Sequence, residues 1–414
     1  MAFDISFWAA LGFFFAAYAV VGNDALQTLG TFINSNRRLP WWVLFIFAAT
    51  VLVLVFAFGY VTDGGELRNP DGTFKELCNF AVGCDPSYGR LENTEKYPIF
   101  DPQWYHALPP LMLLFLTRFG VPVSTTFMVL TIFVTMSGLS SMLQKSLIGY
   151  GLAFSVGGGV YLILSRTVEN FFRRTEHQQH HPGWVALQWI TTSYLWAVWL
   201  MQDFANIFVF LPRDDGVTIG SGLNPAEAIA AVIVTILLLG YTFWNSGGPV
   251  QRILQSKTAV TDIRSATIID FIYASLLFYF KEVNNVPMST TWVFLGLIAG
   301  REYAFSLTTK AVSFLRTTEI ALTDISKAYI GLVISIDMAR GLPWLAKGLS
   351  SGGFQPPPLA ELAPSPNTAW FLIIANGLLI PVAIFFRKKS TMRMGLLAAL
   401  YAVATTAFII LPIF

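Results

Sequence analysis

Long apolar segments are the feature that most constrains the fold of this 414-residue sequence. Eight of them run without interruption, and their lengths are close to the about 20 residues that a helix needs to cross the hydrocarbon core of a bilayer. They are 5–22, 41–61, 148–166, 185–201, 226–246, 327–345, 368–386 and 394–414. Four shorter apolar pieces, 106–118, 122–138, 267–281 and 286–300, form two pairs that are split by Pro122 and Pro287. We therefore expect about twelve membrane elements, all helical, with broken helices in each pair.

The composition supports a membrane protein and excludes several other classes. Only 12% of the residues are charged, against about 25% in an ordinary soluble domain. Hydrophobic residues make up 55% of the chain, and the mean hydropathy is +0.60. Because a soluble surface of this size needs more charge, we exclude a soluble enzyme, a disordered protein and a nucleic-acid binder with a basic face. The sequence therefore predicts an all-α polytopic membrane protein.

Charged loops predict which side of the membrane each end of a span faces. The loop 62–105 contains eight acidic and four basic residues, together with Cys78 and Cys84. We place this loop outside the cytoplasm, where the two cysteines are candidates for a disulfide. Basic clusters lie around residues 37–38, 166–174, 252–264 and 387–393, and these are expected in the cytoplasm. Residues 5–22 lack a basic leader, so we interpret them as the first helix and not as a signal peptide.

Two short motifs occur twice in the same order. Asn23-Asp24 is followed by Gln27, and 179 positions later Gln202-Asp203 is followed by Asn206. The second motif, a proline followed by x-Ser-Thr-Thr, occurs as Pro122 to Thr126 and again as Pro287 to Thr291. This order predicts an internal duplication in which each half supplies one copy of both motifs.

The duplication is expected to have inverted topology, because corresponding segments carry opposite charge. The acidic loop 62–105 corresponds to the basic stretch 247–264. We expect a first repeat at 1–183, including a cytoplasmic linker at 167–183, a second repeat at 184–345, and a loop with two transmembrane helices at 346–414. The two halves would then meet at a central site near the membrane midplane.

The duplicated acids suit a cation. A carboxylate inside an apolar segment costs at least about 2.5 kcal/mol on insertion scales, so Asp24 and Asp203 need a partner. Neither motif contains Lys or Arg. Carboxylate and amide oxygens are ligands for Na⁺, and the acids can also take up H⁺, so we assign cation binding to Asp24, Asp203, Asn23 and Gln202, with Na⁺ at the two acids. The alternatives are that the acids cap helices or are simply protonated.

The Ser-Thr-Thr motifs suit an anion. A proline breaks the helix, and Ser or Thr caps the next helix, whose free N–H groups carry a partial positive charge. Ordinary capping is the alternative for one copy, but two copies in inverted halves would point two helix starts at one place. The predicted oxyanion-binding residues are Ser124, Thr125, Thr126, Ser289, Thr290, Thr291, Gln27 and Asn206.

An anion beside two carboxylates requires compensating cations, since like charges repel strongly at low dielectric constant. The residues thus predict symport of a small oxyanion with cations and no enzymatic activity. An uncoupled oxyanion channel or exchanger would need no acidic cation sites. An intramembrane aspartyl protease is a remote alternative, because two membrane acids can share a proton. Asp270 is expected to form an internal pair, and Gly157 to Gly159 suit close helix packing or a hinge.

The four motifs resemble the signatures of the inorganic phosphate transporter (PiT) family, which are Gly-Ala-Asn-Asp-x-x-Asn and a later Pro-x-Ser-Thr-Thr in each half. The resemblance covers about residues 12–301. Gln27 and Gln202 differ from the amides of the family, and Phe127 and Trp292 stand where the family often has His.

This resemblance implies phosphate as substrate, Na⁺ or H⁺ as coupling ion, no cofactor, and a homodimer as an expected assembly. Sulfate is the alternative substrate, because some relatives carry it. We expect an integral protein of the cytoplasmic membrane of a bacterium.

Overall fold

The computed structural model describes residues 5–36, 38–62, 65, 77–79, 83–118, 123–175, 181–213, 222–245, 263–283, 285–309 and 313–351. Within these residues all regular structure is helical, apart from one isolated β-bridge between Cys84 and Leu223. The two transmembrane helices predicted at 368–386 and 394–414 lie outside the described residues, as does the basic stretch 247–262.

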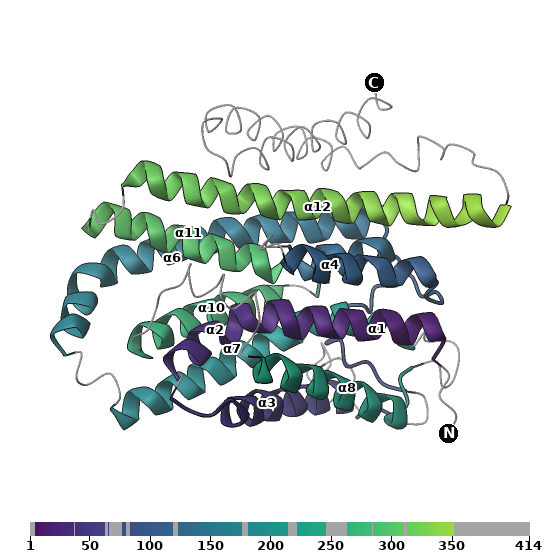
Figure 1. Cartoon of the computed structure of the whole chain (residues 1–414), viewed down its shortest axis with the longest axis horizontal. Helices are drawn as coiled ribbons and strands as arrows, with labels where there is room; N and C mark the ends of the chain where they lie inside the picture. The colour runs from purple at the N-terminus through teal and green to yellow at the C-terminus, as the bar shows by residue number, and fades with distance from the viewer. Residues whose placement is uncertain are drawn as a thin grey trace, which may run out of the picture.

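Eleven α-helices make up this part of the chain (Figure 1). They are α1 (Phe7–Ala19), α2 (Ala25–Ser35), α3 (Trp41–Val61), α4 (Leu108–Arg118), α5 (Thr125–Leu130), α6 (Met136–Arg174), α7 (Pro182–Phe208), α8 (Pro225–Trp244), α10 (Ile263–Val283), α11 (Thr290–Thr309) and α12 (Phe314–Ser351). A π-helical turn, Val20–Asp24, joins α1 to α2, and short 3-10 turns occur at Trp104–Ala107 and Thr131–Phe133.

Five helical stretches are long and apolar enough to cross a membrane. They are Phe7–Asp24, Trp41–Val61, Met136–Ile163, Pro225–Trp244 and Ile263–Val283. On α8, Ile229, Ile233, Leu237 and Tyr241 recur every four residues and are all more than half exposed. An apolar stripe of this kind is stable where lipid, and not water, covers it. The chain is therefore an integral membrane protein.

The prediction of four short pieces is only half right. In the first half, α4 and α5 have 11 and 6 residues. In the second half, the piece predicted at 267–281 is the 21-residue α10, and the piece at 286–300 lies in the 20-residue α11. Polar residues such as Arg264 and Lys281 end an apolar run in the sequence, but they do not interrupt the backbone hydrogen bonds of a helix.

Two predicted boundaries also shift because helices continue through polar residues. The linker predicted at 167–183 is helical as far as Arg174, since α6 runs for 39 residues. The span predicted at 327–345 lies within the 38-residue α12, which extends to Ser351. The helices α7 and α12 are long but too polar to count among the five apolar spans.

The long helices α3 and α8 run side by side in opposite directions. The Tyr60 hydroxyl at the end of α3 donates to the Leu223 carbonyl just before α8, 2.9 Å away. At the other end, the rings of Phe45 and Phe243 lie 6.4 Å apart. These contacts fix α3 and α8 as antiparallel neighbours.

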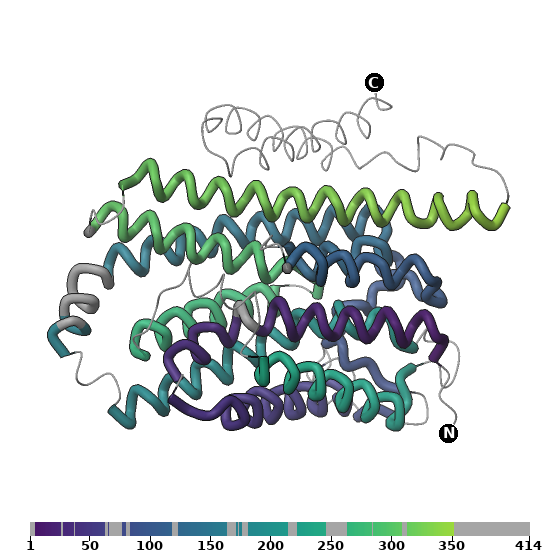
Figure 2. Tube along the Cα trace, in the orientation of Figure 1, coloured from purple at the N-terminus to yellow at the C-terminus, as the bar shows by residue number. Residues whose placement is uncertain are grey.

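The helices α1 and α2 have the same antiparallel relation to α7. Asn36, just after α2, donates to Gln188 near the start of α7 at 2.9 Å. Phe13 of α1 lies 6.4 Å from Phe208 at the end of α7, measured between ring centroids. The continuous course of α1, the π-turn and α2 is visible in Figure 2. The helices α1 and α2 together are therefore antiparallel to α7.

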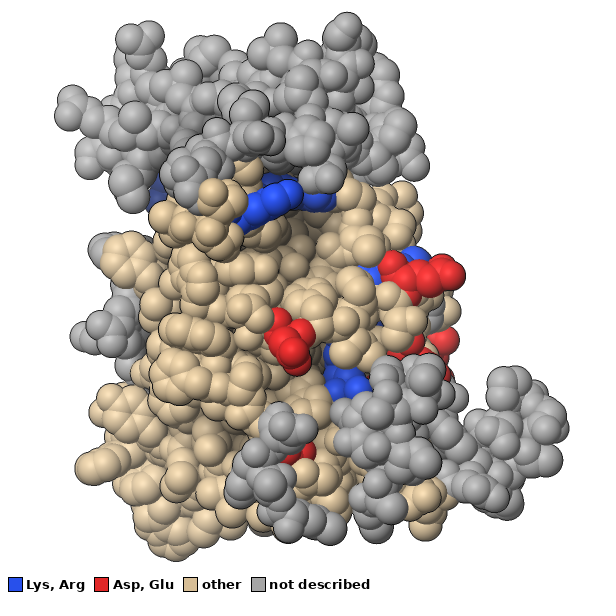
Figure 3. All heavy atoms as spheres, turned by 90° about the vertical axis from the view of Figure 1, so that its right-hand side faces the viewer, with Lys and Arg blue, Asp and Glu red and all other residues tan. Residues whose placement is uncertain are grey.

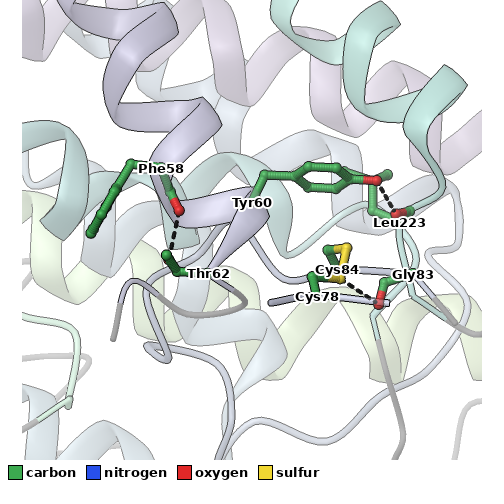
Figure 4. The surroundings of a disulfide bond; sticks show 7 residues. All are labelled: Phe58, Tyr60, Thr62, Cys78, Gly83, Cys84 and Leu223. Carbon is green, nitrogen blue, oxygen red and sulfur yellow. Dashed lines mark hydrogen bonds between the residues drawn. A yellow bond between two sulfur atoms is a disulfide. The ribbon is translucent and has the colours of Figure 1, made fainter. Parts of the chain in front are cut away.

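The segment 83–103 closes one end of this bundle. A disulfide joins Cys78 to Cys84 (Figure 4). The Cys84 N–H donates to the Leu223 carbonyl at 3.2 Å. Arg213, just beyond α7, donates to the carbonyls of Leu91, Tyr97 and Pro98 at 3.4, 3.2 and 2.8 Å. These two contacts, from the chain between α7 and α8, thus hold the segment 83–103 in place.

Seen from the right-hand side of Figure 1, the coloured surface is mostly uncharged, with Asp/Glu and Lys/Arg in small groups (Figure 3).

Candidate functional site

Asp24 lies at the end of the π-turn that interrupts the first helix. Such turns are uncommon within helices and occur frequently at functional sites. The Asn23 amide donates to Asp24 Oδ1 at 2.6 Å. The same amide lies 3.5 Å from the Val123 carbonyl and 3.5 Å from Thr125 Oγ1. The first amide–Asp motif therefore contacts the first Ser-Thr-Thr motif, and Asp24 is completely buried.

Asp203 lies inside α7, five residues before its end. The sequence suggests that the apolar helix ends at this acid, as it does near Asp24, but α7 continues without interruption to Phe208. Asp203 Oδ1 accepts from the Asn206 amide at 2.6 Å, a bond between neighbouring positions on one helical face. The two acids are thus held differently, Asp24 in a π-turn and Asp203 in a regular helix.

Both Ser-Thr-Thr motifs begin a helix, as predicted from the preceding proline. Ser124 Oγ accepts from the Phe127 N–H at 3.2 Å and caps α5, and Ser289 Oγ accepts from the Trp292 N–H at 3.1 Å and caps α11. These bonds satisfy backbone donors of each first turn. The Ser289 N–H donates to Ser146 Oγ of α6 at 2.8 Å, which ties the second motif to that helix.

The two Ser-Thr-Thr motifs meet at Asp203. The Thr126 hydroxyl lies 3.3 Å from Asp203 Oδ1, and the Thr290 hydroxyl donates to Asp203 Oδ2 at 3.1 Å. Thr126 Oγ1 also lies 3.0 Å from the Met288 carbonyl and 3.3 Å from the Asn206 amide. Contacts between residues 77 to 162 positions apart in the chain therefore build one hydrogen-bonded cluster, and all of these side chains are buried.

Three predicted site residues take less direct positions. The Gln202 amide donates to the Leu277 carbonyl of α10 at 3.0 Å, so this end of the side chain binds a neighbouring helix. Thr291 is buried in the first turn of α11. The side chain of Gln27, as well as Val121 and Pro122, lies outside the described residues.

Arg90 is a basic residue near the site that the motif search did not find. Its side chain is 1% exposed, and it interacts electrostatically with Asp203 and Glu282. Burial lowers the pKa of the Arg90 guanidinium to about 10, and the two carboxylates act in the opposite direction. The group therefore stays protonated at neutral pH. Nothing in the sequence marks Arg90 within the acidic loop 62–105.

A third buried acid lies apart from the four motifs. Asp270 of α10 accepts from Thr31 of α2 and from Thr192 of α7, each at 2.7 Å. The sequence suggested an internal pair for this residue, whereas these two contacts come from hydroxyl donors on two other helices. Asp270 thus joins three helices that surround the site.

The Asp203 cluster also contains an acceptor that is not used within the described residues. Asn206 Oδ1 is buried and accepts no hydrogen bond there, because the amide nitrogen faces Asp203. A buried acceptor of this kind costs about 1–3 kcal/mol unless another group satisfies it. A cation, or the O–H of a protonated oxyanion, would satisfy Asn206 Oδ1.

The chain matches no model of a known protein family, no curated protein and no solved structure. Function is therefore inferred from the geometry of the site.

Proposed function

We propose that this protein is a secondary transporter that moves inorganic phosphate across the membrane together with a cation, Na⁺ in preference to H⁺. Sulfate is the alternative substrate. The observation that carries this proposal is the contact of Thr126 and Thr290, from two separate Ser-Thr-Thr motifs, with the buried Asp203. Hydroxyl donors for an oxyanion and a carboxylate for a cation thus lie within one cluster.

The proposed architecture is an inverted-topology repeat with the site where the halves meet. The antiparallel courses of α3 and α8, and of α2 and α7, support it. So does the central position of the interrupted segments, since each Ser-Thr-Thr motif follows a break between two helices. Transporters with such repeats bind their substrates at broken helices near the membrane midplane.

Cation binding at Asp203 would prepare the anion site. In the structure the Thr290 hydroxyl donates to Asp203, and Thr126 lies within hydrogen-bond distance of the same carboxylate. A cation competes for the same carboxylate oxygens, and its charge weakens the hold of the carboxylate on the hydroxyl protons. The two hydroxyls can then turn to an oxyanion, beside the backbone N–H groups that begin α11.

Coupling follows from the charges. Asp24 and Asp203 are both fully buried, and a phosphate dianion beside them would be repelled strongly at low dielectric constant. Bound cations remove this repulsion, so each ligand strengthens the binding of the other. We expect phosphate affinity to rise with Na⁺ concentration, and Na⁺ affinity to rise by the same factor with phosphate.

The test is uptake of labelled phosphate into proteoliposomes that contain the purified protein. An inward Na⁺ gradient should drive accumulation, and an H⁺ gradient should drive less. Unlabelled sulfate serves as competitor and identifies the preferred oxyanion. If uptake does not change with any cation gradient, symport is rejected and an uncoupled channel or exchanger is favoured.

Substitutions distinguish the cation-binding groups of the site from its anion-binding groups. Asp203→Asn removes the carboxylate charge, so the Na⁺ dependence of uptake should be lost. Thr126→Val and Thr290→Val each remove one donor at nearly constant volume and should weaken phosphate binding about 10- to 100-fold, the effect of one hydrogen bond to a charged group. Thr192→Val, which removes a hydroxyl bonded to Asp270, is the matched control and should leave phosphate affinity unchanged.

A further inference from the structure

The buried Arg90 is brought to the central site by the loop between α3 and α4. It lies in a series of turns at 86–91, and its own N–H donates to the Ser87 carbonyl at 3.2 Å. Only 1% of its surface is exposed. Burial of an arginine is costly unless negative charge or hydrogen-bond acceptors lie beside it. Its position therefore needs a reason in the chemistry around it.

Tyr88 places these turns beside Asp203. The Tyr88 ring lies 6.4 Å from the ring of Phe204, the residue that follows Asp203. Its hydroxyl donates to the Val55 carbonyl of α3 at 2.5 Å. The backbone of Tyr88 has a φ of 57°, which is rare for a bulky residue and is retained only where the surroundings enforce it. Packing on α3 and α7 thus fixes the direction of the chain just before Arg90.

The same turns also lie against the break before α11. A Cβ atom placed on Gly89 would be 3.1 Å from the side-chain nitrogen of Asn285, in the connection between α10 and α11. The next residue, Val286, accepts from Lys145 Nζ of α6 at 2.8 Å through its carbonyl. Arg90 and Lys145 also interact electrostatically. The Arg90 guanidinium and the Lys145 amine therefore lie near the start of the second Ser-Thr-Thr motif.

The charge of Arg90 adds to the site a group that the motifs alone do not supply. The four motifs supply two acids, amides and hydroxyls, but no basic side chain. Arg90 lies within electrostatic range of Asp203, whose carboxylate receives the Thr126 and Thr290 hydroxyls. A guanidinium binds a tetrahedral oxyanion through two parallel N–H···O bonds, and this fork suits phosphate and sulfate.

We propose that Arg90 is an anion-binding residue of the central site, and that its guanidinium forms a two-pronged contact with a phosphate- or sulfate-type dianion. This inference rests on the proposed function, and it makes the loop between α3 and α4 part of the substrate site. Lys145 Nζ donates to the Val286 carbonyl and so supports the backbone at the break before α11.

The experiment measures phosphate, sulfate and Na⁺ binding to the purified full chain by calorimetry. Arg90→Gln should weaken phosphate and sulfate binding about 10- to 100-fold, the effect of losing charge-assisted hydrogen bonds. In the absence of both oxyanions, the same substitution should tighten Na⁺ binding, because a positive charge near Asp203 has been removed. A general loss of structure would weaken both ligands, so the opposite signs identify a direct role.

Arg264→Gln is the matched control. Arg264 is also 1% exposed, but it donates to the Phe172 and Thr175 carbonyls at the end of α6, at 2.8 and 3.2 Å. Its loss should lower the melting temperature without opposite changes in the two affinities. Arg90→Lys retains the charge but loses the fork, so its oxyanion affinity should lie between those of the wild type and Arg90→Gln.

Each outcome separates this inference from the proposed function. If the wild type binds neither phosphate nor sulfate, the proposed function fails. If the wild type binds one of them, and a folded Arg90→Gln binds it within twofold of the wild type, the role of Arg90 is rejected. Should Arg90→Gln not fold, Arg90→Lys decides instead, and an oxyanion affinity equal to that of the wild type rejects the two-pronged contact.

Discussion

Asp203 and Asp270 are both buried acids that threonine hydroxyls approach, yet their surroundings differ. The threonine hydroxyls that approach Asp203 lie in the first turns of α5 and α11, where one helix ends and the next begins. The threonine hydroxyls that bind Asp270 lie within the continuous helices α2 and α7. Hydroxyls beside a break can be redirected toward a ligand with little cost to the helix. Hydroxyls between two continuous helices instead join those helices. We therefore assign Asp270 a structural role.

At this scale we predict that Asp270→Asn lowers stability without changing coupling. One of its two hydroxyl donors loses a charged acceptor, which should cost about 1–2 kcal/mol. Thermal unfolding in detergent measures the loss, and Na⁺-driven phosphate uptake should keep its Na⁺ dependence. Loss of that dependence in a variant with unchanged melting temperature would make Asp270 a cation site.

At the scale of elements, glycines set the distance between α6 and α11. These helices run parallel, because Gly149 lies against Val293 and Gly157 against Leu297. A Cβ atom on Gly157 would lie 2.7 Å from the Leu297 carbonyl oxygen, whereas one on Gly159 would have no neighbour within 4 Å. The run Gly157 to Gly159 predicted close packing or a hinge, and the contacts favour close packing. Since α11 begins with the second Ser-Thr-Thr motif, this packing positions the motif.

We predict that Gly157→Ala and Gly159→Ala have different effects, although they are two residues apart on one helix. Gly157→Ala forces α6 and α11 apart and should cost about 1–3 kcal/mol, as overpacking of a tight contact does. Gly159→Ala adds a methyl group in open space and should leave stability unchanged or slightly higher. Melting temperatures of both variants in one detergent measure the difference. Equal melting temperatures would show that α6 and α11 do not depend on this contact.

At the scale of the whole molecule, the segment 83–103 and the start of α7 lie at opposite ends of the bundle (Figure 1). From the charges of the sequence, we predict that the first end lies outside the cytoplasm and the second end lies inside it. Glu95 and His181 are exposed at these two ends. The sequence has two cysteines, and both form the disulfide, so an introduced cysteine is the only free thiol.

We predict that a membrane-impermeant maleimide labels Glu95→Cys in intact cells and does not label His181→Cys. Both variants should react after the membrane is permeabilised. The wild type, labelled in parallel, measures the background from the disulfide. Labelling of His181→Cys alone in intact cells would reverse the orientation and place the Cys78–Cys84 disulfide in the cytoplasm.

Local sequence determined the membrane class, most helix positions and the composition of the site. Apolar runs fix where helices form, because a chain in lipid must satisfy its backbone hydrogen bonds within each helix. For the same reason, α3 was predicted to the residue at 41–61. The capping roles of Ser124 and Ser289 followed from the preceding prolines, since capping depends only on neighbouring residues.

Tertiary structure decided which of these residues meet. The approach of Thr126 and Thr290 to Asp203 joins positions 77 and 87 residues apart, and no local rule sets such distances. The place of Arg90 near Asp203 could not be predicted from the sequence, because burial and charge pairing depend on packing and not on the neighbours along the chain. In this protein the sequence determined which chemical groups are present, and the packing of distant helices decided which of them form one site.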